Sequence, residues 1–120
     1  MTQIWFRGNG KNPDQDPYFV HYYRVNFDGT GLVALTEGNG DHARREGMRV
    51  ILPLMSPGEK YLIDTYSRVD MAPVTELRRV EDGKLVTKLE EADITDLKAS
   101  GWKPLEVFTA KARDGKTDIW

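Results

Sequence analysis

Three Asp-Gly pairs divide the chain and constrain its fold more than any other feature. They are Asp28-Gly29, Asp82-Gly83 and Asp114-Gly115. Because glycine adopts a positive φ at little cost, Asp-Gly between apolar runs is the strongest short-range signal for a β-hairpin. The flanking runs are rich in aromatic and β-branched residues, which favour strands. The sequence therefore predicts a chain of antiparallel hairpins.

Strands and one helix are expected between these turns. The predicted strands are residues 4–7, 18–27, 32–36, 48–55, 60–68, 74–80, 85–89, 107–112 and 117–120. Residues 48–55 are nearly continuously apolar, which is typical of a strand buried on both faces. Residues 37–47 read as a polar loop. The helix is predicted at 94–100, with Asp93 as its N-cap, Gly101 as its stop and Pro104 preventing continuation.

Two segments of the chain share one layout. Residues 23–36 and 74–89 each contain a strand, an Asp-Gly turn and a returning Leu-Val strand. The two turns lie about 54 residues apart, close to the roughly 40–50 residues of a propeller blade. The predicted fold is therefore mainly β, with antiparallel four-stranded blade-type sheets, about one and three-quarter blades in all, and a short helix near the C-terminus. Because propellers have about 4–8 blades, so few blades do not close a ring.

Composition excludes several classes of function. The chain has 120 residues with 17 Lys plus Arg against 19 Asp plus Glu, a net charge of −2, which argues against a nucleic-acid binder. It has no cysteine, which excludes disulfides and thiolate chemistry. Residues 48–55, the longest apolar run, fall far short of the ~20 residues of a membrane helix. We expect no membrane span and see no secretory signal at the start, so localisation stays open.

A serine triad can be written down but is not expected to form. The serines are Ser56, Ser67 and Ser100, and none lies in a Gly-x-Ser-x-Gly turn. Ser67 could be combined with Asp64 and with His21 or His42. However, residues three apart on one strand face opposite sides. We expect His21 to face solvent and His42 to belong to the polar loop.

Two further patterns suggest ligands only weakly. Asn12, Asp14 and Asp16 have the spacing of a calcium loop, but Pro17 and Tyr23 occupy the positions that require Gly and Glu. We interpret the segment as a surface loop. The doubled arginines, 44–45 and 78–79, could bind an anion but are expected to be solvated. The sequence thus assigns no catalytic, cofactor-binding or metal residue, and no cofactor.

Aromatic residues crowd the strand predicted at 18–27 and alternate between its faces. One face is expected to pack in the core and the other against a neighbouring blade. These aromatic residues are Tyr18, Phe19, Tyr22, Tyr23 and Phe27.

Several stretches resemble the later propeller blades of the prolyl oligopeptidase and dipeptidyl peptidase IV family of serine peptidases. They lie within residues 8–36, 56–75 and 92–119, so the resemblance covers nearly the whole chain. The most specific parts are Asp-Thr-Tyr-Ser-Arg-Val-Asp at 64–70 and Gly-Trp-Lys-Pro at 101–104. One departure is the turn at 56–60, Ser-Pro-Gly-Glu-Lys, where the family usually has Ser-Pro-Asp-Gly-Lys. With glycine one position early, we expect the turn to differ.

The resemblance implies a non-catalytic fragment of a larger exopeptidase. Residues 1–91 would be propeller blades, 92–104 a linker helix and 105–120 the first hairpin of an α/β-hydrolase domain, with the catalytic triad beyond Trp120. The propeller of such an enzyme gates substrate access and braces the catalytic domain. The implied partners are a peptide substrate, the remaining blades and the hydrolase domain, and the parent would be exported or periplasmic.

Two further expectations follow from the fragment interpretation. The isolated chain should self-associate through unpaired strand edges. The competing hypothesis is a free-standing β-rich binding module for a peptide or glycan. An independent domain should close its sheet, whereas residues 117–120 read as a strand without a terminating turn.

Overall fold

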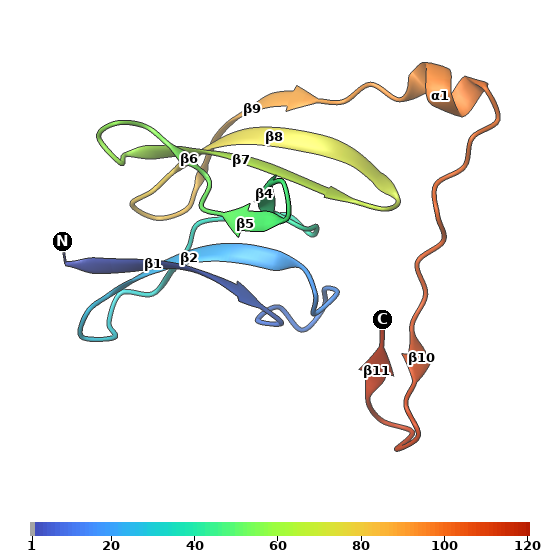
Figure 1. Cartoon of the computed structure of the whole chain (residues 1–120), viewed down its shortest axis with the longest axis horizontal. Coiled ribbons are helices and arrows are strands. Elements are labelled where there is room, and N and C mark those ends of the chain that lie inside the picture. The colour runs from blue at the N-terminus through green and yellow to red at the C-terminus, as the bar shows by residue number, and fades with distance from the viewer. Residues whose placement is uncertain (1) are drawn as a thin grey trace.

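The computed structural model describes residues 2–120 and is mainly β, built from antiparallel sheets with one short helix near the C-terminus (Figure 1). This confirms the predicted fold class. The first sheet has the strand order β1-β2-β3. Its strands are β1 (Gln3–Asn9), β2 (Val20–Asn26) and β3 (Val33–Ala34). A small hairpin of β4 (Arg44–Glu46) and β5 (Arg49–Ile51) lies between this sheet and the next (Figure 1).

The second sheet is a four-stranded antiparallel meander in the order β6-β7-β8-β9. Its strands are β6 (Leu54–Met55), β7 (Tyr61–Arg68), β8 (Met71–Arg79) and β9 (Leu85–Glu91). Sequential antiparallel strands are the arrangement of a propeller blade. The pairing of β8 with β9 is irregular at two places, between Thr75 and Glu76 and between Leu77 and Arg78.

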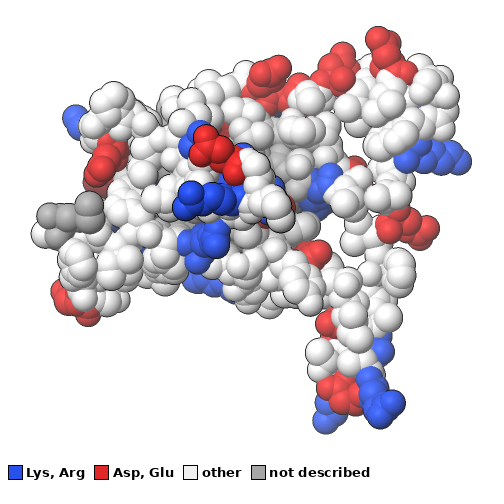
Figure 2. Space-filling model, viewed as in Figure 1, with Lys and Arg blue, Asp and Glu red and all other residues white. Residues whose placement is uncertain are grey.

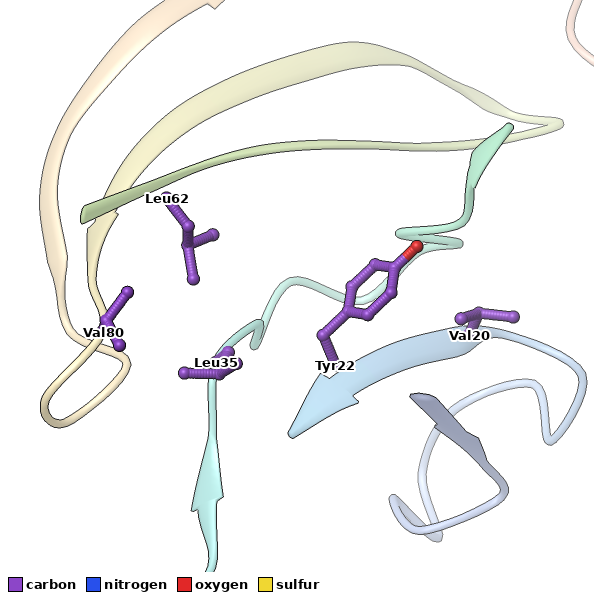
Figure 3. Close-up of a cluster of buried hydrophobic side chains, with 5 residues drawn as sticks. All are labelled: Val20, Tyr22, Leu35, Leu62 and Val80. Atoms are coloured by element: carbon purple, nitrogen blue, oxygen red, sulfur yellow. The ribbon is translucent and has the colours of Figure 1, made fainter. Parts of the chain in front are cut away.

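The hydrophobic core joins the two sheets. In Figure 3, Leu62 on β7 and Val80, directly after β8, approach Leu35, while Tyr22 and Val20 extend from β2. Tyr22, Leu35 and Leu62 are each only 1% exposed. Because the alternation of a strand sends every second side chain to one face, Leu62 enters the core while Tyr61 and Ile63 stay exposed. The inner face of the second sheet is therefore buried against the first sheet.

Two polar contacts reinforce this packing. The Arg24 guanidinium donates through Nε to the Val80 carbonyl at 2.9 Å and through Nη2 to the Glu81 carbonyl. Gly83, with φ of 72°, lies directly against the first sheet, since a Cβ there would be 1.9 Å from the Ala34 oxygen. Glycine is thus required at this turn for both its backbone angle and its close approach.

The last 29 residues leave the second sheet as an arm (Figure 1). It carries α1 (Thr95–Ala99) and a hairpin of β10 (Ala110–Lys111) and β11 (Asp118–Ile119). The helix begins one residue later than predicted, with Ile94 rather than Asp93 at the N-cap. Asp93 still accepts hydrogen bonds from the Thr95 N–H and hydroxyl, so it fixes the turn that precedes the helix.

One strand prediction and one loop prediction near the middle of the chain are wrong. Residues 48–55 do not form one doubly buried strand: Met48 is fully exposed, and Leu52 and Leu54 are 42% and 51% exposed. Pro53 cannot donate to a ladder and separates β5 from β6. The predicted loop at 37–47 contains β4, because Gly47 adopts a positive φ and turns the chain into a hairpin with β5.

Candidate functional site

A buried histidine–aspartate pair is the most prominent polar contact in the structure. Alternation along β7 turns Asp64 inward, beside Leu62. His42 contacts Asp64 from the loop that precedes β4. Two contacts hold this loop: the His42 N–H donates to the Val20 carbonyl at 3.0 Å, and Asp41 forms an isolated β-bridge with Ser67. His42 Nδ1 lies 2.9 and 2.8 Å from the two Asp64 carboxylate oxygens. Each residue is 1% exposed.

The second nitrogen of His42 is also engaged. Nε2 lies 2.7 Å from the Gly38 carbonyl oxygen. A carbonyl and a carboxylate both only accept hydrogen bonds, so both contacts form together only when each ring nitrogen carries a proton. In a serine triad Nε2 must be free to take the proton of the nucleophile. His42 therefore has the histidine–aspartate geometry of a triad without an available base.

Ser67 does not complete a triad with this pair. It contacts Asp41 through backbone hydrogen bonds, and the ring that stacks on His42 is Tyr66, with centroids 4.6 Å apart. Burial raises the pKa of Tyr66, so the neutral phenol lies against the pair. The structure therefore pairs His42 with Asp64, and the side chain stacked on His42 is an aromatic ring instead of a nucleophile.

His21 is buried, at 3% exposure, and the prediction that it faces solvent is wrong. Its ring lies 4.6 Å from that of His42. Nε2 is 2.8 Å from Gln15 Oε1, and Nδ1 is 3.2 Å from Thr36 Oγ1, which itself accepts the Tyr22 N–H. Neutral imidazole with its proton on Nε2 satisfies all of these contacts. Burial, and next the charge of His42, lowers the pKa of His21 to about 4.

Arg78 completes a buried charge cluster with His42, Asp64 and Glu76. Its Nε and Nη2 lie 2.9 and 2.7 Å from Glu76 Oε2, and its Nε lies 3.7 Å from Asp64 Oδ2. Nη1 donates to the Gly83 carbonyl at 2.9 Å. Burial lowers the pKa of Arg78, but the hydrogen bond and charge of Glu76 outweigh it and the net pKa is raised.

The prediction that both arginine pairs are solvated is therefore wrong for Arg78. Its inward position follows from the alternation Val74, Glu76, Arg78 along β8, continued by Val80 directly after it, in which charged residues occupy the buried phase. The matching run Leu62, Asp64, Tyr66 on β7 follows the same rule. Charged residues at alternating core positions on neighbouring strands are a signal that could have located this cluster.

The other candidate residues stabilise turns and surface contacts. Asn12 donates to the Gln15 side chain, and Asp16 accepts the Tyr18 N–H, so these side chains fix the loop between β1 and β2. Among residues 2–120, no group of three or more His, Asp or Glu side chains could hold a metal ion. Arg45 pairs with Asp41 at 3.3 Å, and Arg44 donates to the Leu52 carbonyl.

The aromatic strand is buried on both faces by the chain itself at two positions. Tyr22 enters the core, and Tyr23, on the opposite face, stacks on Phe6 with centroids 5.4 Å apart. Tyr18 and Phe27, at the ends, are exposed. Elsewhere on the surface, acidic and basic side chains are interspersed over the face shown in Figure 2. That face therefore offers no extended field of one sign for an oppositely charged partner.

No family model, curated protein or solved structure matches the chain. Within the described residues, no helix is both long enough and apolar enough to cross a membrane. The interpretation of the cluster therefore depends on its geometry. Four buried groups, His42, Asp64, Glu76 and Arg78, contact one another and bind a loop to two strands of the second sheet. This arrangement suits structural stabilisation.

Proposed function

We propose that the chain is a non-catalytic, structural part of a prolyl oligopeptidase- or dipeptidyl peptidase IV-like serine exopeptidase. In that protein its blade-type sheets would help to gate substrate access and to brace the catalytic domain. The proposal rests on the sequence resemblance at residues 64–70 and 101–104 and on the absence of an available base at His42.

The observation that carries the proposal is the outer face of the second sheet. Leu54 pairs with Ile63, and Ile63 pairs with Leu77, so the three side chains form an apolar row across β6, β7 and β8. Leu54 is 51% and Ile63 39% exposed. Blades of a propeller pack face to face, and an apolar row on the outer face suits contact with a neighbouring sheet.

The arm supports the same proposal. Leu105 and Phe108, in the extended stretch between α1 and β10, are 69% and 75% exposed. Large apolar side chains on an extended segment are typical of a region that packs against further structure. An adjoining α/β-hydrolase domain is the neighbour that the resemblance implies.

Two measurements test the proposal. First, the purified chain should not cleave chromogenic Xaa-Pro dipeptide substrates; turnover that disappears in Ser67→Ala would overturn the non-catalytic assignment. Second, the coding sequence should continue beyond Trp120 into an α/β-hydrolase region with a Gly-x-Ser-x-Gly elbow. A stop codon directly after Trp120 would contradict the parent enzyme and favour a free-standing binding module.

A further inference from the structure

β1 is an edge strand, and within residues 2–120 its outer backbone groups have no strand partner. It is the outermost strand of the first sheet, and its seven residues pair with β2 in continuous register. The Phe27 N–H donates to the Thr2 carbonyl at 3.1 Å. This bond makes Thr2 and Phe27 a hydrogen-bonded pair and so fixes which residues of β1 form backbone hydrogen bonds with β2. Hydrogen-bonded and non-hydrogen-bonded pairs alternate in an antiparallel ladder. The backbone N–H and C=O groups of Ile4, Phe6 and Gly8 therefore point toward β2. The N–H and C=O groups of Gln3, Trp5 and Arg7 therefore point outward.

The two long edge strands differ in how they are protected. β9 carries Lys88, Glu90 and Glu91 and is irregular at two places in its pairing with β8. Charges and bulges are the devices that prevent edge-to-edge pairing. β1 has neither bulge nor proline, and Arg7 is its single charged residue. A long, regular and weakly charged edge is the kind that pairs with another strand.

We propose that two copies of this chain associate through β1, antiparallel across a two-fold axis at Phe6. Phe6 is the midpoint of Gln3–Asn9, so this register alone pairs the whole strand with itself. Gln3 then lies opposite Asn9 of the second copy, and Trp5 opposite Arg7 of the second copy. An Arg beside a Trp ring is favourable, whereas a register centred on Arg7 would bring two like charges together.

The chain lacks cysteine, so a single introduced cysteine reports the register directly. Phe6 would face its own symmetry mate in a non-hydrogen-bonded pair, with Cα atoms about 4.5 Å apart. That spacing lies within the range of a disulfide, about 4.4–6.8 Å. Phe6→Cys should therefore form a covalent dimer under mild oxidation. In Ile4→Cys, the matched control, the two Cα atoms would lie about 13 Å apart and should not cross-link.

The backbone contact is tested by a second matched pair. Arg7→Pro removes an outward N–H that would donate across the axis, and proline is tolerated where that N–H faces away from the sheet. Arg7→Ala removes the same side chain and keeps the N–H. Sedimentation equilibrium should show a dimer for the wild-type chain and Arg7→Ala and a monomer for Arg7→Pro, with circular dichroism confirming the fold.

Several results would overturn the inference. They are a monomeric wild-type chain at its highest soluble concentration, a dimer that survives Arg7→Pro, or Ile4→Cys cross-linking as readily as Phe6→Cys. The inference concerns this chain by itself and goes beyond the proposed function. The peptidase assay and the downstream coding sequence therefore decide the proposed function independently of the oligomeric state.

Discussion

Lowering the pH tests whether the fold holds His21 neutral. Burial, followed by the charge of His42, lowers the pKa of His21 from 6.5 to about 4. Thr36 and Gln15 satisfy both nitrogens of the neutral ring. In the unfolded chain the same imidazole keeps its ordinary pKa. Between the two pKa values, the unfolded chain therefore binds a proton that the folded chain does not.

The sign and size of the effect follow from this difference. Because the unfolded state binds more protons, the free energy of unfolding falls as the pH drops from about 6.5 to about 4. One pKa unit corresponds to about 1.4 kcal/mol, so the full contribution of His21 is about 3 kcal/mol. Moving from about pH 7 to about pH 4.5 should remove about 2 kcal/mol of it.

The assay is urea unfolding followed by far-ultraviolet circular dichroism, at low protein concentration so that self-association does not contribute. His21→Gln is the control, because glutamine cannot gain a proton while the carboxylates elsewhere titrate as in the wild type. The wild-type chain should lose about 2 kcal/mol more than His21→Gln on acidification. Equal losses in the two proteins, or a wild-type chain stabilised by acid, would refute the reasoning.

Three substitutions test other parts of the structure, each measured as the free energy of unfolding. Asp64→Asn removes the buried carboxylate that faces His42 and Arg78 and should cost about 3 kcal/mol. The surface control Asp82→Asn, whose side chain is 31% exposed, should change the unfolding midpoint little; equal effects would contradict a structural cluster. Glu59→Gly should stabilise the chain by about 0.5–1 kcal/mol, because Glu59 has a φ of 52°. A loss of stability there would mean that the glutamate side chain matters more than its backbone strain. Gly83→Ala should cost more than 2 kcal/mol, since the new Cβ meets the Ala34 carbonyl; tolerance of alanine would contradict that close approach.

The turn at 56–60 shows what a local sequence pattern predicts and what it leaves open. The glycine lies one position earlier than in the family turn, and the structure places the positive φ on Glu59, the next residue. The turn keeps its hydrogen bond from the Glu59 N–H to the Ser56 carbonyl at 2.8 Å. The structure thus places the positive φ of this turn on a non-glycine residue, while the expected difference from the family turn stays a prediction.

Local residue patterns predicted the hairpins and the mainly β class, because an Asp-Gly turn and the strands beside it depend on residues close together in the chain. The meeting of His42, Asp64 and Arg78 in one buried cluster, with His21 against the His42 ring, depends on tertiary packing. They come from β2, a loop, β7 and β8, and the same polar side chains are equally compatible with solvent until two sheets pack. Burial and partner choice depend on that packing, which local residue patterns do not specify.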